Sequence, residues 1–541
     1  MRTRSLAPLV ALGLVAACTT PRAPVLSGLG DHRMEVTTKL NESQSYFDQG
    51  LALTYAFNHA EAARAFREAR RLDPSNAMAS WGLALALGPN INAPMTPEAE
   101  AEARAALDEA IVRVDDSTEK ERALIEAMTL RFDALGGVDR AARDQSYADA
   151  MGRLAGRYPD DPDICTLAVA AFMETTPWNY WNKDGTPREG TERAVQALEA
   201  VLARHPDHAG AIHYYIHLVE ASKNPGRAEA AADRLAGLMP GAGHIVHMPS
   251  HIYMRVGRYS DAANTNVRAI LADEQYLSEC HAQGLYPVGY YPHNIHFLWA
   301  ARCMQGRYED ALDAANDVAK QVKGGTCCGF SELGPEDQMS TPLYTMVRFG
   351  KWRDILAAKR PPADQEFATA MWHYARGMAL AATFERNAAQ AELDALRLLQ
   401  SDPELTGASL NLDTGGDVLA IAERCLTAEI AAHKDDLAGA VEALQEAVAL
   451  QDDLSYMEPP TFYYPVRQSL GAVLLEAERF AEAEAVYEAD LAEWPENGWS
   501  LYGLAVAQRG VIKMNDARES ERRFDRAWAE ADVKLKTSVF R

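Results

Sequence analysis

The chain has 541 residues, a formal net charge of −24 and an isoelectric point near 5.1. This acidity argues against nucleic acid or anionic lipid as a partner, because both are polyanions that favour basic surfaces. Six cysteines follow Cys18, too few for a disulfide scaffold of this length.

The first segment reads as an export signal. Arg2 and Arg4 precede an apolar run that ends at Ala17, and small residues stand directly before Cys18. A run this short is typical of a cleaved signal and not of a membrane span. The pattern resembles a bacterial lipobox, which implies signal peptide 1–17, lipidation of Cys18, a tether over 18–42 and a place on the cell envelope facing the periplasm or exterior. The alternative is an ordinary secretory signal and a soluble periplasmic protein.

A repeat begins at Ser43. Its positions 4, 8, 20, 24, 27 and 32 are Tyr46, Gly50, Ala62, Phe66, Ala69 and Pro74. Near the other end, positions 8, 20, 24 and 32 of a later unit are Gly471, Ala483, Tyr487 and Pro495. This spacing resembles the tetratricopeptide repeat (TPR), a 34-residue helix-turn-helix unit in which small residues let two helices approach and a proline ends the second. The resemblance covers about Ser43 to Arg523, with insertions.

Strand patterns are missing, so the sequence predicts one all-α domain over 43–541. The resemblance implies an α-solenoid of antiparallel helix pairs that form a right-handed superhelix. The amphipathic stretch 517–533 is expected to cap it.

Histidines are concentrated in the middle of the chain, where eight of the 14 lie between 213 and 296. Counted in the repeat, they fall at positions 2, 5 and 9 of three consecutive units within the section 209–305. These spacings of three and four put side chains on one stripe of the first helix of each unit. In the TPR family that stripe lines the concave groove. The seven histidines of the stripe are His213, His217, His244, His247, His251, His293 and His296.

This clustering points to a transition-metal site. Neighbouring rings depress one another's basicity through desolvation and like-charge repulsion, and a bound cation removes that cost. Neutral imidazole is the commonest transition-metal ligand. The sequence is also compatible with a polar groove that binds a ligand without metal, or with histidines that serve unrelated structural roles.

Copper is favoured slightly over zinc or iron. Imidazole suits all of these metals, while Met248, Met254 and Cys303 offer soft sulfur nearby. If there is chemistry, Glu220 or Glu174 is the candidate to move protons.

Three local features bear on the histidine stripe. Pro249 must either start a helix or kink one, and in the first case the histidines before it come from a loop. The inserts 176–181 and 275–291 either form a wall over the groove or merely fill the junctions between repeats. The second insert contains His281, the eighth histidine of the region.

The remaining motifs are few. The pairing of Cys165, Cys280, Cys303, Cys327, Cys328 and Cys425 stays open, although the adjacent Cys327 and Cys328 are not expected to bond each other. No P-loop, dinucleotide fingerprint, nucleophile elbow or His-Glu-x-x-His motif is present. Two functions remain: a groove that holds metal for catalysis or metal binding, and a non-catalytic TPR scaffold that binds a peptide or partner protein. The sequence does not decide whether the chain is an enzyme.

Overall fold

The computed structural model describes residues 22–132, 139–280, 286–323 and 331–541. Cys18 and the signal segment, His281, Cys327 and Cys328 lie outside these ranges, so the predictions about them remain predictions. Within the described residues, no helix is both long and apolar enough to span a membrane.

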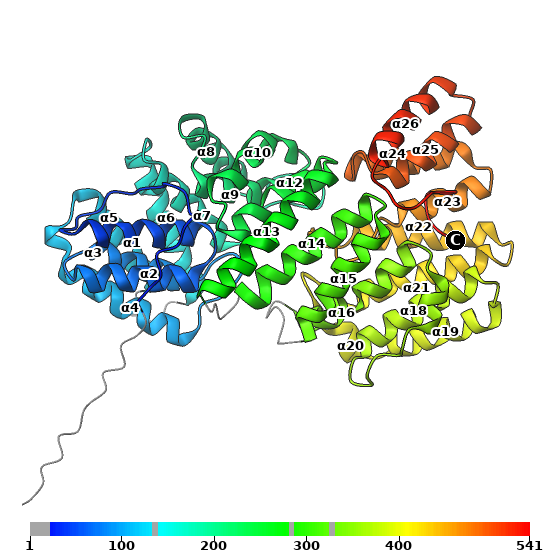
Figure 1. Cartoon of the computed structure of the whole chain (residues 1–541), viewed down its shortest axis with the longest axis horizontal. Coiled ribbons are helices and arrows are strands. Elements are labelled where there is room, and N and C mark those ends of the chain that lie inside the picture. The colour runs from blue at the N-terminus through cyan, green and yellow to red at the C-terminus, as the bar shows by residue number, and fades with distance from the viewer. Residues whose placement is uncertain (1–21, 133–138, 281–285, 324–330) are drawn as a thin grey trace, which may run out of the picture.

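Helices follow one another from the first repeat to the last and pack chiefly on their neighbours in the chain, which confirms the predicted all-α solenoid (Figure 1). The first section comprises α1 (Asn41–Tyr55), α2 (His59–Leu72), α3 (Ala77–Leu87), α4 (Pro97–Val112), a 3₁₀ turn (Val114–Asp116), α5 (Glu119–Phe132), α6 (Arg140–Arg157) and α7 (Pro162–Thr175).

The middle section carries the histidine repeats. It comprises α8 (Thr191–Arg204), α9 (Ala209–Val219), a 3₁₀ turn (Pro225–Ala228), α10 (Glu229–Leu238), α11 (Gly243–His247), α12 (Pro249–Arg255), α13 (Tyr259–Cys280), a π-helical turn (Tyr286–Tyr290), α14 (Tyr291–Met304) and α15 (Tyr308–Lys323).

The last section comprises α16 (Gly334–Arg348), α17 (Trp352–Ala357), α18 (Glu366–Ala382), α19 (Arg386–Gln400), α20 (Pro403–Gly407), α21 (Gly415–Ala432), α22 (Leu437–Asp452), α23 (Arg467–Glu476), α24 (Phe480–Glu493), α25 (Gly498–Gly510) and α26 (Met514–Ala527). The only sheet among the described residues is the antiparallel pair β1 (Ser409–Leu410) and β2 (Asp413–Thr414).

Polar residues start many of these helices. The Asn76 side chain accepts a hydrogen bond from the backbone N–H of Ala79, and Asp161 caps α7 in the same way just before a proline at its first turn. Thr414 and Asp417 form a reciprocal capping box at α21. Such caps satisfy N–H groups that have no partner inside the helix.

The small residues of the repeat pack as the TPR spacing predicts. A Cβ on Gly50 of α1 or on Gly82 of α3 would lie 2.8 or 2.3 Å from the ring of Phe66 on α2. Near the other end, Gly471 and Gly503 approach Tyr487 just as closely. A large ring at position 24 therefore fills the space that glycines leave on the helices before and after it.

The chain folds back on itself after α22. The Trp499 indole N–H of α25 donates to the Cys303 carbonyl of α14, and the Tyr259 hydroxyl of α13 donates to the Pro495 carbonyl. Arg255 at the end of α12 pairs with Glu493 at 2.8 Å. The last repeats therefore lie against the histidine repeats (Figure 1).

Both ends of the described chain add to this packing. Residues 22–40, the described part of the expected tether, run along α1 and bury Leu29 and Met34. At the other end, α26 stops at Ala527, and the following residues return to α15, where the Asp532 carboxylate accepts the backbone N–H of Tyr308.

Candidate metal centre

Six of the seven stripe histidines form two groups of three. Site 1 consists of His213 and His217 on α9 and His244 on α11, and site 2 consists of His247, His251 and His293 on α11, α12 and α14. In each group, one potential ligand atom per ring lies within 4.8 Å of the other two. A metal bound at about 2.0 Å by imidazole nitrogens holds them only a few ångströms apart, so small rotations bring each group to that geometry.

The two sites have nearly the same shape. Ring centroids in site 1 are 4.8, 4.9 and 6.0 Å apart, and those in site 2 are 4.8, 4.9 and 5.8 Å apart. The repeat explains this likeness, because His213 and His247 are separated by 34 residues, as are His217 and His251. Each site takes positions 5 and 9 from one unit and position 2 from the next.

His296 belongs to neither site. It occupies position 5 of the third unit, but position 9 of that unit is Ala300, and its ring instead stacks on Trp299 at 5.0 Å. The structure therefore brings six of the seven candidate ligands together and leaves the seventh aside.

The helix break at Pro249 lies within site 2, between His247 on α11 and His251 on α12. α11 ends at His247 and α12 begins at Pro249, while the backbone of Met248 between them keeps right-handed helical angles. The proline therefore kinks the helix. His244 and His247 lie on α11 and not in a loop, which excludes that alternative.

The ring nitrogens that face away from the partner histidines are held in place. The Nδ1 atom of His213 is 2.6 Å from the Tyr55 carbonyl oxygen, and that of His247 is 2.7 Å from Asn266 Oδ1. Because a carbonyl oxygen can only accept, each of these Nδ1 atoms carries the hydrogen and leaves the Nε2 lone pair free. Such outer contacts orient metal-binding histidines.

The free nitrogens meet one another. His213 Nε2 lies 3.1 Å from His244 Nε2, and His247 Nε2 lies 2.9 Å from His251 Nε2. The buried Nε2 of His217 has no hydrogen-bond partner. Without metal these ring pairs share hydrogen bonds, and a cation that replaced the shared hydrogens would find the same nitrogens directed at it.

Glu220, at the C-terminal end of α9, connects the two sites. Its Oε1 accepts from Nδ1 of His217 at 3.2 Å, and its Oε2 lies 2.6 Å from Nδ1 of His251. Glu458, from the loop between α22 and α23, reaches the same His251 nitrogen at 3.2 Å. Two buried carboxylates thus stand directly behind the histidines, and Glu220, His251 and Glu458 form a further group whose potential ligand atoms lie within 4.8 Å of one another.

The electrostatics follow from this placement. Burial and neighbouring histidines lower the pKa values of His213, His244, His247 and His293 well below 6.5. Burial also lowers the pKa of His251, but Glu220 and Glu458 outweigh it and raise the value to about 10. Without metal, most of these rings are neutral while His251 carries a proton, located where a cation would otherwise bind.

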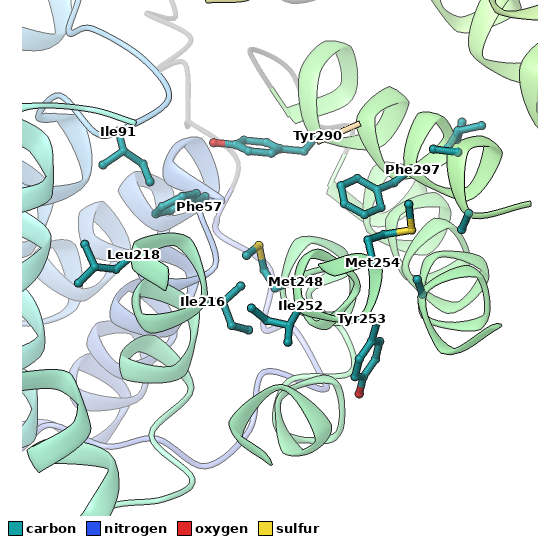
Figure 2. Packing of buried hydrophobic residues seen from close by; sticks show 14 of the residues in the cluster. Phe57, Ile91, Ile216, Leu218, Met248, Ile252, Tyr253, Met254, Tyr290 and Phe297 are labelled. Atoms are coloured by element: carbon teal, nitrogen blue, oxygen red, sulfur yellow. The ribbon is translucent and has the colours of Figure 1, made fainter. Parts of the chain in front are cut away.

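An aromatic shell surrounds the histidines. Phe57 lies 4.4 Å from His213, Tyr290 4.7 Å from His244 and Phe297 4.7 Å from His251, as ring centroids. Figure 2 shows these three rings at close range. The insert residue Trp178 adds an edge contact to His217 at 5.1 Å. Both inserts therefore contribute to the wall of the site and do more than fill junctions.

Of the other predicted contributors, Glu174 and Cys303 lie elsewhere. Glu174 pairs with the buried Arg131 and lines a separate cavity with His59, Tyr147 and Tyr214, so it is not placed to move protons at the histidines. Cys303 is buried in the core outside both sites. Met248 and Met254 belong to the apolar packing drawn in Figure 2, which also includes Phe57, Tyr290 and Phe297. Cys165, Cys280 and Cys425 are free thiols like Cys303.

A third cluster of histidines serves the structure. His32 Nε2 and His208 Nε2 lie 2.8 and 3.2 Å from Asp163 Oδ1, and the Tyr55 hydroxyl donates to the same oxygen. His208 Nδ1 accepts the backbone N–H of Ala211, so its Nε2 carries the hydrogen. The group is thus a set of donors on one carboxylate.

Comparison with known proteins gives only distant likenesses. No protein-family model and no curated protein matches the chain. Human IFIT1, solved as a dimer with m7Gppp-AAAA, aligns over 84% of this chain and 91% of its own, at 12% identity and a TM-score of 0.33. Yeast Tom70 aligns over 88% and 90%, at 9% identity and a TM-score of 0.28. The TPR domain of P58(IPK) aligns over 87% and 98%, at 12% identity and a TM-score of 0.21. The solenoid fold of the present chain rests on its own helix pairs.

Proposed function

We propose that this protein binds two transition-metal ions, one in each three-histidine site, on a TPR-like scaffold. The observation that carries the proposal is the convergence of Nε2 atoms, 3.1 Å apart in site 1 and 2.9 Å apart in site 2, with outer nitrogens fixed by Tyr55, Asn266 and Glu220. Buried polar atoms normally have partners, and a cation in site 1 would supply one for Nε2 of His217, which lacks a hydrogen-bond partner.

The alternative is a scaffold that binds a peptide or partner protein in the same groove. The burial of five of the seven stripe histidines argues against it: His213 and His247 are 0% exposed and His251 is 4% exposed, whereas His293 and His296 are partly exposed. A peptide would have to displace the aromatic shell and the loop that carries Glu458 before it touched these rings.

Metal analysis of the purified chain tests the proposal. We expect about two ions per chain at neutral pH, and about one after either His217→Ala or His251→Ala, because each change removes a ligand from one site only. His205→Ala is the matched control, since His205 is exposed at the turn between α8 and α9 and lies in neither site. If the metal content is unchanged by the first two substitutions, or falls equally with the third, the proposal is overturned.

We also propose that the chain acts at the bacterial cell envelope through acylation of Cys18. Multiple acyl chains give stable attachment where one does not. Cys18→Ala is expected to move the protein to the soluble fraction or to block its maturation, which fractionation measures. Unchanged membrane association would point to another anchor.

A further inference from the structure

The two sites lie close enough to share one ligand. Across the boundary between them, the rings of His217 and His251 are 5.6 Å apart and those of His244 and His247 are 5.9 Å apart. These separations are close to the longest ones within the sites, 6.0 and 5.8 Å. The six rings are therefore one continuous cluster, and ions held in the two halves face each other across it.

Each ion would keep an open coordination position. Three nitrogens do not complete the coordination of a first-row transition metal, and an open position is what distinguishes a reactive site from a structural one. Phe57, Tyr290 and Phe297, all under 8% exposed, surround the cluster. An additional ligand that both ions share must therefore be small and must tolerate apolar surroundings.

The charge of the surrounding residues limits which metal ions fit the cluster. The six rings are neutral when they bind metal, and Glu220 and Glu458 supply two negative charges beside them. The buried cation Arg255 also lies near these carboxylates, but its charge is balanced by its ion pair with Glu493. Buried charge is costly unless it is compensated. Two monovalent ions balance these carboxylates, whereas two divalent ions leave a buried excess of two positive charges.

The donor chemistry agrees with this count. Open non-haem iron sites place a carboxylate beside two histidines on the metal. Here Glu220 and Glu458 contact Nδ1 of His251, whereas its Nε2 faces His247, so the carboxylates stand behind a histidine ligand. Copper is the imidazole-binding metal that is stable as a monovalent ion, and this choice does not use the methionines.

From this geometry we infer that the two sites hold a pair of Cu(I) ions that binds one molecule of O₂ between them. The inference rests on the proposed metal binding and names its metal and small ligand. In the binding step each Cu(I) gives one electron and becomes Cu(II), and O₂ accepts both electrons and becomes peroxide. The O–O bond order falls from two to one, and each copper ion forms bonds to oxygen. No proton is transferred and no group leaves.

The charge balance also holds after this step. Two Cu(II) ions carry four positive charges, which the peroxide and the two carboxylates cancel. The buried centre is therefore neutral before and after O₂ binds, so the change of oxidation state leaves no uncompensated charge in the core.

The test uses the full mature chain, charged with Cu(I) without oxygen and freed of excess copper by a chelator. We expect two copper ions per chain, uptake of one O₂ per chain, and loss of the Cu(I) absorption edge. The oxidised centre should give no electron paramagnetic resonance signal, because two Cu(II) ions joined by peroxide couple their spins. Two retained copper ions that take up no O₂, or that oxidise to give separate Cu(II) signals, would overturn the inference.

Single-site variants distinguish a copper pair that binds O₂ jointly from two copper ions that act independently. His213→Gln and His247→Gln each remove a ligand from one site, and we expect about one copper ion per chain and no O₂ uptake from either. His296→Gln is the matched control, because His296 lies near the cluster but in neither site, and it should behave as the unchanged chain. A single-site variant that still takes up one O₂ per chain without a resonance signal would contradict the pairing, even if the other variant does not fold.

The outcomes also separate this inference from the proposed function. A chain that retains two zinc ions and no copper keeps the metal-binding proposal and overturns the copper pair. A chain that retains no metal overturns both.

Discussion

At the scale of single residues, Glu220 has the most connections of any side chain at the site. It is buried, and its two oxygens contact histidines that belong to different sites. Burial raises its pKa, but His251 and His217 outweigh this and lower the value to about 2, so it stays ionised. Outer-shell carboxylates of this kind typically change metal affinity by about 10–100-fold.

Glu220→Gln is therefore expected to weaken binding of both ions by about 10–100-fold, because the amide keeps the shape but loses the charge behind His217 and His251. Metal titration in the presence of a competing chelator measures the change. Glu423→Gln is the control, since Glu423 is also buried and pairs with Arg397 on α19, away from the histidines. Loss of affinity for one ion alone would show that Glu220 serves only one site.

At the scale of elements, glycines and large rings set the distance between helices. Gly82 on α3 lies against Phe66, whereas Gly152, in the exposed part of α6, has nothing within 4 Å of where a Cβ would be. Alanine is a better helix former than glycine by about 1 kcal/mol. The two positions separate this helix preference from the packing requirement.

We expect Gly82→Ala to lower the free energy of unfolding by about 1–3 kcal/mol, because its methyl group would overlap the Phe66 ring. Gly152→Ala should raise it by about 0.5–1 kcal/mol. Urea denaturation followed by circular dichroism measures both. Equal effects of the two substitutions would mean that the packing of Phe66 does not limit the approach of α2 and α3.

At the scale of the whole molecule, folding brings many neutral histidines into the interior. The pKa values of His213, His244, His247 and His293 lie well below 6.5 in the folded chain and return to about 6.5 on unfolding. Below pH of about 6.5, the unfolded chain therefore binds protons that the folded, metal-free chain does not. His251, with its raised pKa, has the opposite sign, but its stabilisation is already complete below that pH.

The metal-free protein should accordingly lose stability as the pH falls below about 6.5, by up to about 1.4 kcal/mol per pH unit for each such ring. Urea denaturation of the metal-free chain between about pH 7.5 and 5 measures this. Burial raises the pKa values of Glu174, Asp273 and Asp337 to about 7, and these carboxyls contribute with the opposite sign, so the His213→Gln variant serves as the reference. Bound metal should leave in the same range, because protons compete for the same nitrogens. A pH dependence that is the same in the unchanged chain and in this variant would show that the His213 ring is not held neutral in the folded chain.

The repeat made part of the centre predictable. The spacing put seven histidines on one stripe and offered Glu220 and Glu174 as candidates to move protons, and the structure brings six of these histidines and Glu220 together. The sequence gives a weaker indication for Asn266, because it is a polar residue at position 24, where other units carry the large rings of Phe66 or Tyr487. His296 shows the limit of the spacing, because a stripe position does not say whether the next position on that stripe also carries a ligand.

The sequence by itself determined the helix pairs, their close packing and the stripe of histidines, since these depend on residues within one or two repeats. Only the tertiary structure decided how the stripe divides into two sites, and it alone brought Tyr55 and Glu458 to them. The physical reason is distance along the chain: Tyr55 precedes the histidine repeats and Glu458 follows them, and no local periodicity reports where a superhelix folds back. The fold-back that lays α24 and α25 against α12–α14 also sets the burial of the site, and with it the neutral rings on which metal binding depends.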